Sequence, residues 1–119
     1  MEDLVMNPAF SEGLMERVLS VSAGIAEYLL EEVGDYVDVV LFPDDLGFQD
    51  RPYMRQSMYT EKVKPYHRRL EETIKSNTSA KVLMHSDGSI YKHLPDIIDI
   101  VGNIQQVLPG ARLRTCAER

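Results

Sequence analysis

Polar side chains that could do chemistry follow two short apolar runs of the chain. Asp44 and Asp45 follow the first run, and His85 and Asp87 follow the second. A carboxylate beside an imidazole can share a proton or hold a metal ion. If the two runs are neighbouring parallel strands, their polar ends face one opening, where the sites of parallel α/β proteins lie. We therefore predict Asp45, His85 and Asp87 as candidate catalytic residues, and His85 and Asp87 as candidate metal ligands.

The same two loops supply further side chains that could bind a substrate. The candidates are Asp44, Gln49, Arg51, Tyr53, Ser86 and Gly88. A plain structural interpretation also fits: Asp-Asp-Leu-Gly is common as a turn or helix cap, and Asp-Gly is a common turn dipeptide. Tyr53 could line a pocket or pack its loop down, and the sequence leaves both interpretations open. His67 and His93 fall on predicted helices, where a surface or packing role is the more frequent one.

A long helix is predicted before the first loop. Asn7 is suited to the N-cap and Pro8 to the first helical position, and Gly34 is suited to the end, so the helix covers about residues 8–33. Apolar residues then recur at steps of three and four and predict one buried face. They are Phe10, Leu14, Val18, Val21, Ile25, Leu29 and Val33.

The rest of the chain alternates between strand and helix patterns. Residues 36–42 are β-branched and nearly continuously apolar, as in a buried strand of a parallel sheet, and residues 80–85 form a second such run. A second helix covers about 55–76 with a kink or break at Pro65. A third begins near Leu94 and extends through Val101 toward Ile104. This alternation predicts an α/β fold with parallel strands.

Composition sets limits on the class of protein. The chain has 119 residues, enough for one small domain, with a net charge of −6 and a pI near 5.0. An acidic chain is a poor partner for nucleic acid. The single cysteine, Cys116, excludes an internal disulfide framework and a cysteine-rich zinc site. No segment is apolar enough to span a membrane and the acidic start is unlike a signal peptide, so we expect a cytoplasmic protein.

Three stretches together resemble the uroporphyrinogen decarboxylase superfamily: "DDLGFQ", "VKPYHRRL" and "HSDGSI". The similarity is greatest to its uroporphyrinogen-III decarboxylase-like branch, close to the corrinoid and cobalamin methyltransferases. It covers about residues 5–100, with a divergent tail over 101–119. The resemblance implies a single partial domain over 1–119, a partial (β/α)8 TIM barrel in the order helix–strand–helix–strand–helix, with its site at the carboxyl ends of the strands.

The resemblance also implies an activity. The intact enzyme would be a lyase of porphyrin biosynthesis that decarboxylates a tetrapyrrole, or a methyltransferase acting on a methylated-corrinoid partner. Asp45 would contact the substrate or orient a donor, His85 would be an acid–base group or metal ligand, and Asp87 would orient His85. Arg51 is the one cation in the two loops, which favours methyl transfer over an anionic tetrapyrrole.

This chain departs from the family in three ways. The N-terminal aspartate and basic residues of the decarboxylases, and a histidine near the end of their barrel, have no counterpart here. Zinc methyltransferases of the family carry His-x-Cys and a distant cysteine, whereas His85-Ser86-Asp87 stands here and Cys116 lies too near. The pattern also fades after about Ile100. We therefore expect a fragment that is inactive alone, with zinc or another divalent metal as the candidate cofactor.

Two alternatives stand beside the enzyme fragment. The chain could be a non-catalytic half-barrel that forms a homo-oligomer through apolar residues of its strands, since such patches seldom stay in water. Those residues are Val37, Val39, Leu41 and Leu83. It could also be a small metal-binding module that uses Asp45, His85 and Asp87.

Overall fold

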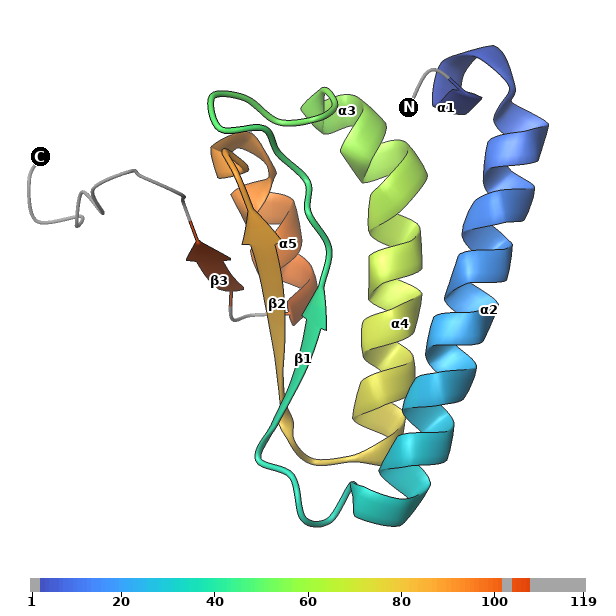
Figure 1. The fold of residues 1–119 in the computed structure, drawn as a ribbon, viewed down its shortest axis with the longest axis vertical. Coiled ribbons are helices and arrows are strands. Elements are labelled where there is room, and N and C mark those ends of the chain that lie inside the picture. Colours follow the sequence, from blue (N-terminus) through green and yellow to red (C-terminus); the bar gives the residue numbers. More distant parts are fainter. Residues whose placement is uncertain (1–2, 102–103, 108–119) are drawn as a thin grey trace, which may run out of the picture.

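The computed structural model describes residues 3–101 and 104–107 of the chain (Figure 1). Its elements follow one another as α1 (Asp3–Met6), α2 (Pro8–Val33), β1 (Val39–Pro43), α3 (Gln56–Met58), the π-helical turn η1 (Tyr59–Val63), α4 (Lys64–Asn77), β2 (Lys81–Asp87), the 3-10 turn η2 (Tyr91–His93), α5 (Leu94–Val101) and β3 (Ile104–Val107). The predicted tail from residue 109 onward lies outside the described residues.

The long helix forms where the sequence predicts it. The side-chain oxygen of Asn7 accepts a hydrogen bond from the Phe10 N–H at 3.4 Å, Pro8 is the first residue of α2, and the cap residue is Gly34. The second helical segment is interrupted as predicted. Pro65 has no N–H to donate to the preceding turn, and η1 widens the helix immediately before α4.

The three strands form one parallel sheet in the order β1-β2-β3. β2 extends two residues further than predicted, so Ser86 and Asp87 belong to the strand and not to a loop. Met84–Asp87 pair with Ile104–Val107 of β3. The prediction that Ile104 continues the third helix is therefore wrong. Because the pairing of β2 with β3 is made by backbone groups, the pattern of side chains in the sequence does not predict it.

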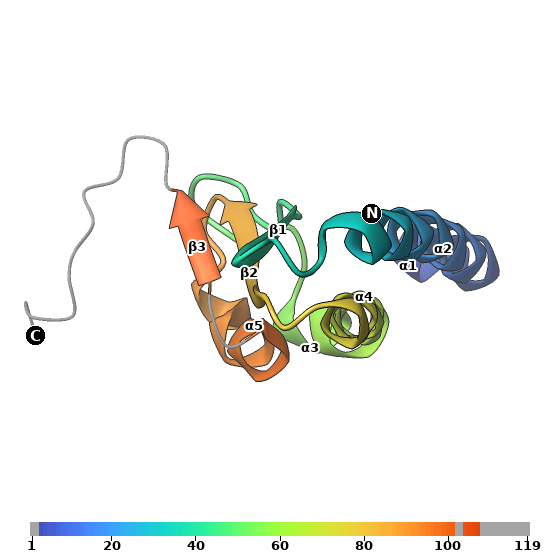
Figure 2. The same ribbon diagram turned by 90° about the horizontal axis from the view of Figure 1, so that it is seen from below.

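Among the described residues, helices cover one face of the sheet. In Figure 2, α4 and α5 pack below the sheet, and α2 lies beside α4 beyond the β1 edge. Alternate strand residues such as Phe42, Val82 and Met84 point into this core and are buried. Val39 and Leu41 belong to the opposite face and are about half exposed.

The predicted partial (β/α)8 barrel is wrong. Among residues 3–101 and 104–107 there are three strands, and β1 and β3 are the edges of an open sheet. A barrel needs eight strands whose register and tilt close the sheet on itself. What the structure shows is a small α/β domain with parallel strands.

The predicted burial of the α2 face is also wrong. The seven apolar residues of that face retain between 43% and 56% of their accessible surface. They are Phe10, Leu14, Val18, Val21, Ile25, Leu29 and Val33. The side of α2 that packs on α4 instead carries Leu19 and Leu30, which are buried. The periodicity predicted the helix correctly. It did not predict which of two adjacent apolar faces of α2 packs against α4.

Candidate functional site

The loop after β1 is fastened to the end of β2 by three hydrogen bonds. The Asp44 N–H donates to the His85 carbonyl at 2.9 Å, and the Leu46 N–H donates to the Ser86 hydroxyl at 3.1 Å. The Asp87 N–H donates to Oδ1 of Asp45 at 3.0 Å. Because these bonds alternate between the two segments, the backbone under the candidate site is held in one arrangement.

Two glycines allow this close approach. Gly88 has a φ of +83°, in the region that favours glycine, and a Cβ placed there would collide with the Gly47 carbonyl oxygen. The Ser89 N–H donates to the Phe48 carbonyl at 2.7 Å directly beside this contact. Gly88, predicted as a substrate-binding residue, therefore has a backbone role.

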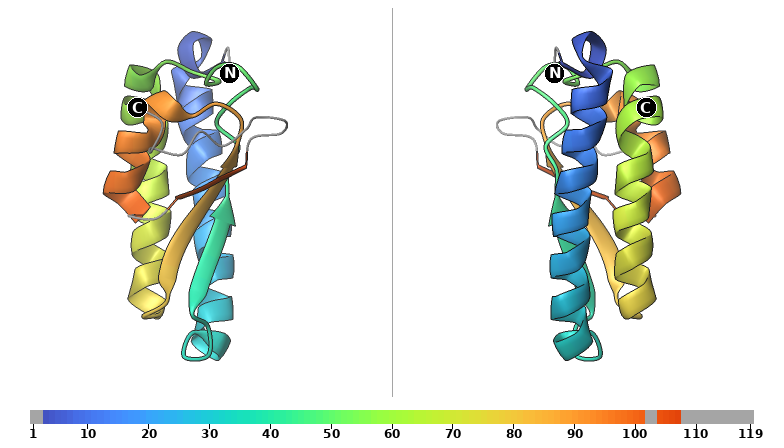
Figure 3. Two further views of the ribbon diagram at one scale, coloured as in Figure 1. Left: turned by 90° about the vertical axis from the view of Figure 1, so that its left-hand side faces the viewer. Right: turned by 90° about the vertical axis from the view of Figure 1, so that its right-hand side faces the viewer.

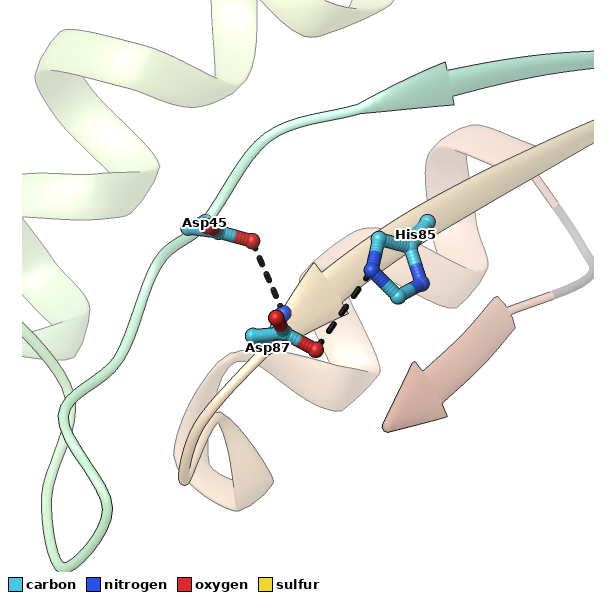
Figure 4. A group of neighbouring side chains, drawn as sticks. All are labelled: Asp45, His85 and Asp87. Atoms are coloured by element: carbon cyan, nitrogen blue, oxygen red, sulfur yellow. Dashed lines mark hydrogen bonds and ion pairs between the residues drawn. The ribbon is translucent and has the colours of Figure 1, made fainter. Parts of the chain in front are cut away.

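Asp45, His85 and Asp87 gather at the carboxyl ends of β1 and β2, as predicted (Figure 4). One potential ligand atom from each side chain lies within 4.8 Å of the others. His85 and Asp87 are two residues apart in β2 and share a face, with His85 Nε2 3.4 Å from Asp87 Oδ1. That Oδ1 atom is buried and accepts no hydrogen bond among the described residues, whereas the Asp87 side chain as a whole is 44% exposed.

The donor set of this cluster suits a divalent metal. One imidazole nitrogen and two carboxylates are ligands that Zn²⁺, Mn²⁺ and Fe²⁺ accept. Neither Asp45 nor Asp87 forms an ion pair with a lysine or arginine in the part of the chain that the structure describes. No lysine or arginine of the described residues therefore competes with a cation for these two carboxylates.

The other predicted site residues do not join the cluster. Ser86 is fully buried, and its hydroxyl accepts a hydrogen bond from the Leu46 N–H. Arg51 forms an ion pair with Asp50 at 3.0 Å, and its guanidinium lies over the Phe48 ring. Tyr53 packs edge-on against Phe48 at 4.5 Å, so it fastens its own loop. Gln49 is exposed at the tip of that loop. Asp44 turns instead toward α4.

Asp44 is the exposed end of a hydrogen-bonded network that sequence reasoning missed, and the other two members, His67 and Tyr59, are buried. His67 Nε2 lies 2.7 Å from Asp44 Oδ2, and its Nδ1 lies 3.0 Å from the Tyr59 hydroxyl. Burial, together with the charges of Asp96 and Asp44, raises the pKa of Tyr59, so its hydroxyl stays protonated. In the Nε2–H tautomer of His67, this hydroxyl donates to Nδ1 and Nε2 donates to Asp44. The available signal was the spacing of Tyr59, Val63 and His67, four residues apart on one helical face.

His93 completes the packing of this network. Its ring is fully buried and stacks on Tyr59 with centroids 4.8 Å apart. Burial lowers the pKa of His93, with smaller opposing effects from Asp96 and the Met54 backbone, so the ring stays neutral near pH 7. Of the two roles predicted for His93, surface or packing, the structure shows packing.

His67 and Asp44 also line one end of a groove of about 600 Å³. The groove runs between α2 and β1, and its floor is formed by Leu70 and Ile74 of α4 and by Phe42. Nearly all its lining is apolar, and Asp44 and His67 are the ionisable groups of its wall apart from Tyr66.

Comparison with known proteins found no relatives of this chain. No family model matches it, and neither the curated proteins nor the solved structures include a match. None of the described helices is both long and apolar enough to cross a membrane.

Proposed function

We propose that the chain binds a divalent first-row metal ion, such as Zn²⁺ or Mn²⁺, through Asp45, His85 and Asp87. The observation that carries this proposal is the convergence of three ligand atoms within 4.8 Å around a buried Asp87 oxygen that lacks a hydrogen bond. A buried carboxylate oxygen without a partner is costly, and a bound cation would offset that cost.

The rigid backbone supports the same proposal. Asp45 is oriented by the Asp87 N–H through one oxygen, which leaves its second oxygen available to a metal. His85 pairs with β1 on one side and with β3 on the other, and Asp87 pairs with β3. Three protein ligands leave coordination positions for water or a substrate, which is the arrangement of catalytic metal sites. Water on such an ion becomes a stronger acid, so the site could support hydrolytic or lyase chemistry.

The cluster could instead be only the polar end of a tightly turned sheet. Asp45 already has a structural partner, so its replacement would disturb the backbone as well as any metal. The variants that distinguish the two cases are therefore His85→Ala and Asp87→Asn. Asp38→Asn is the matched control, because Asp38 is exposed and contributes its backbone carbonyl to Lys81.

Calorimetric titration of the chelator-treated chain tests the proposal. We expect one Zn²⁺ per chain, weaker binding of Mn²⁺ and weakest binding of Mg²⁺, following ligand preference and the usual order of divalent affinities. His85→Ala and Asp87→Asn should each weaken Zn²⁺ binding by at least about tenfold, and Asp38→Asn should not. Binding should also weaken in acid, because a metal-binding imidazole must be unprotonated. Equal Zn²⁺ binding by the native chain and His85→Ala would remove the proposal, as would a native chain that binds no metal.

The tetrapyrrole and corrinoid activities implied by the family resemblance stay predictions, as does the cytoplasmic location. An anionic tetrapyrrole requires cationic contacts, and Arg51 is engaged with Asp50 away from the cluster. Metal binding is the function that the geometry supports better.

A further inference from the structure

The longest helix of the molecule exposes an apolar surface along its whole length. The α2 stripe consists of Phe10, Leu14, Val18, Val21, Ile25, Tyr28, Leu29 and Val33, whose exposed fractions run from 43% to 71%. The right-hand view of Figure 3 shows that α2 lies on the outside of the molecule, with α4 beside it. Contiguous apolar patches of this extent mark interaction sites.

We propose that the α2 stripe is the core of a two-fold symmetric interface, in which α2 packs antiparallel against α2 of a second copy of this chain.

The stripe is arranged symmetrically about its own centre. Phe10 and Val33 are equally distant in sequence from the point between Val21 and Ser22. Leu14 and Leu29 form a second such pair about this point, and Val18 and Ile25 form a third. In a two-fold interface, residue i meets residue j of the other copy while j meets i. An antiparallel pair centred here therefore brings apolar side chains opposite apolar side chains from end to end.

The charges of α2 favour the antiparallel direction. Arg17 is the only basic residue of α2, it is exposed, and it forms no ion pair with the described residues. Glu12 and Glu16, in the same half of the helix as Arg17, are already paired with Lys62 and Arg69. The exposed Glu27 and Glu31 lie in the opposite half. Antiparallel packing places each Arg17 near the acidic half of the other copy, and the two helix dipoles also oppose each other favourably. Parallel packing would instead bring the acidic halves together.

The stripe supplies a large share of the apolar surface that a stable dimer needs. Full burial of a large apolar side chain stabilises by about 1.5–3 kcal/mol, at about 25 cal/mol per Å² of apolar surface. Each such side chain therefore has roughly 60–120 Å² of apolar surface to bury. Eight half-exposed side chains therefore offer roughly 240–480 Å² of apolar surface. A standard interface buries about 800 Å² per partner, of which about 65% is apolar in homodimers. Val39 and Leu41 on the adjoining sheet face, both about half exposed, add to this surface.

Light scattering coupled to size-exclusion chromatography tests the association. The native chain should be a dimer at roughly 100 μM, well above the micromolar dissociation constants of weak specific complexes. Val21→Glu should be monomeric, because it places two carboxylates against each other at the two-fold axis. Ser20→Glu is the matched control, since Ser20 is exposed on α2 but lies outside the stripe, and it should stay dimeric. Chelator is present throughout, so the result does not depend on the metal proposal.

Disulfide trapping tests the direction of packing. In a Cys116→Ser background, Leu14→Cys and Leu29→Cys are prepared as separate chains and oxidised alone and mixed. Antiparallel packing predicts linked dimers only in the mixture, whereas parallel packing predicts that each variant links to itself. A monomeric native chain, a Val21→Glu chain that stays dimeric, or self-linking Leu14→Cys would each overturn the proposal.

Discussion

The hydroxyl of Tyr59 offers the sharpest test of the network that joins Tyr59, His67 and Asp44. Tyr59→Phe removes the donor to His67 Nδ1 while it keeps the ring that stacks on His93. Tyr59 is fully buried and His67 is only 6% exposed, so water cannot replace the lost hydroxyl. A buried acceptor left without a donor costs about 1–3 kcal/mol, and we expect the free energy of unfolding to fall by that amount.

Urea unfolding followed by circular dichroism measures this change at pH 7. All variants are compared at one chain concentration, because association would shift apparent stability. In a separate thermal unfolding experiment, the midpoint temperature of Tyr59→Phe should fall by about 5 °C for each kcal/mol of lost stability. Tyr36→Phe is the control: Tyr36 is 86% exposed, and its stability should stay within about 0.5 kcal/mol of the native chain. If Tyr59→Phe is as stable as Tyr36→Phe, the hydrogen bond to His67 does not stabilise the fold.

The alkaline limb provides an independent check on the same group. Burial raises the pKa of Tyr59 above its ordinary value of 10.0, so above that pH the unfolded chain loses a proton that the folded chain keeps. Stability from this group is full below pH 10 and is lost as the pH rises further. The difference in stability between the native chain and Tyr59→Phe should therefore narrow above about pH 10. A difference that stays constant into this range would show that Tyr59 ionises in the folded protein as easily as in the unfolded one.

Two further substitutions test contacts that hold the site in place. Asp96 accepts a hydrogen bond from Lys64 at 2.8 Å, and this bond lowers the pKa of Asp96. The stability that the ionised Asp96 adds to the fold is therefore present above its ordinary pKa of 3.8 and is lost in more acidic solution. Asp96→Asn should lower stability at pH 7 by about 1 kcal/mol and flatten the acid limb in urea titrations, and an unchanged acid limb would contradict this assignment. Gly88→Ala should cost about 1–3 kcal/mol in thermal or urea unfolding, because its φ is positive and its Cβ meets the Gly47 carbonyl. Gly13→Ala, at an open helical position, should instead stabilise by up to about 1 kcal/mol, and equal effects of the two glycine changes would refute the close approach.

Local features of the fold were predictable because their causes are local. Asn7 and Pro8 start α2 through a side-chain cap and a restricted φ, and Pro65 interrupts the second helix because it lacks an N–H. The polar residues after β1 and β2 were also predicted to meet, since parallel neighbouring strands end on one edge. The structure brings Asp45 to His85 and Asp87 in this way.

The predictions that were wrong, and the contacts that were missed, depend on how elements pack. The apolar face of α2 was expected inside, but α4 covers the adjacent face and leaves the stripe exposed. The contact of Asp44 with His67, a residue far along the chain, was missed, and the predicted substrate-binding role of Asp44 stays a prediction.

The sequence by itself determined where helices begin and break and which residues stand at the strand ends, because capping, proline geometry and strand alternation act within a few residues. The tertiary structure alone decided that the sheet stays open, that β2 continues to Asp87, and that Asp44, His67 and Tyr59 form one network. These outcomes follow from backbone pairing and from competition between apolar faces for a neighbour. Backbone pairing and the choice between apolar faces do not depend on the type of any single residue. They therefore cannot be predicted before the elements are packed together.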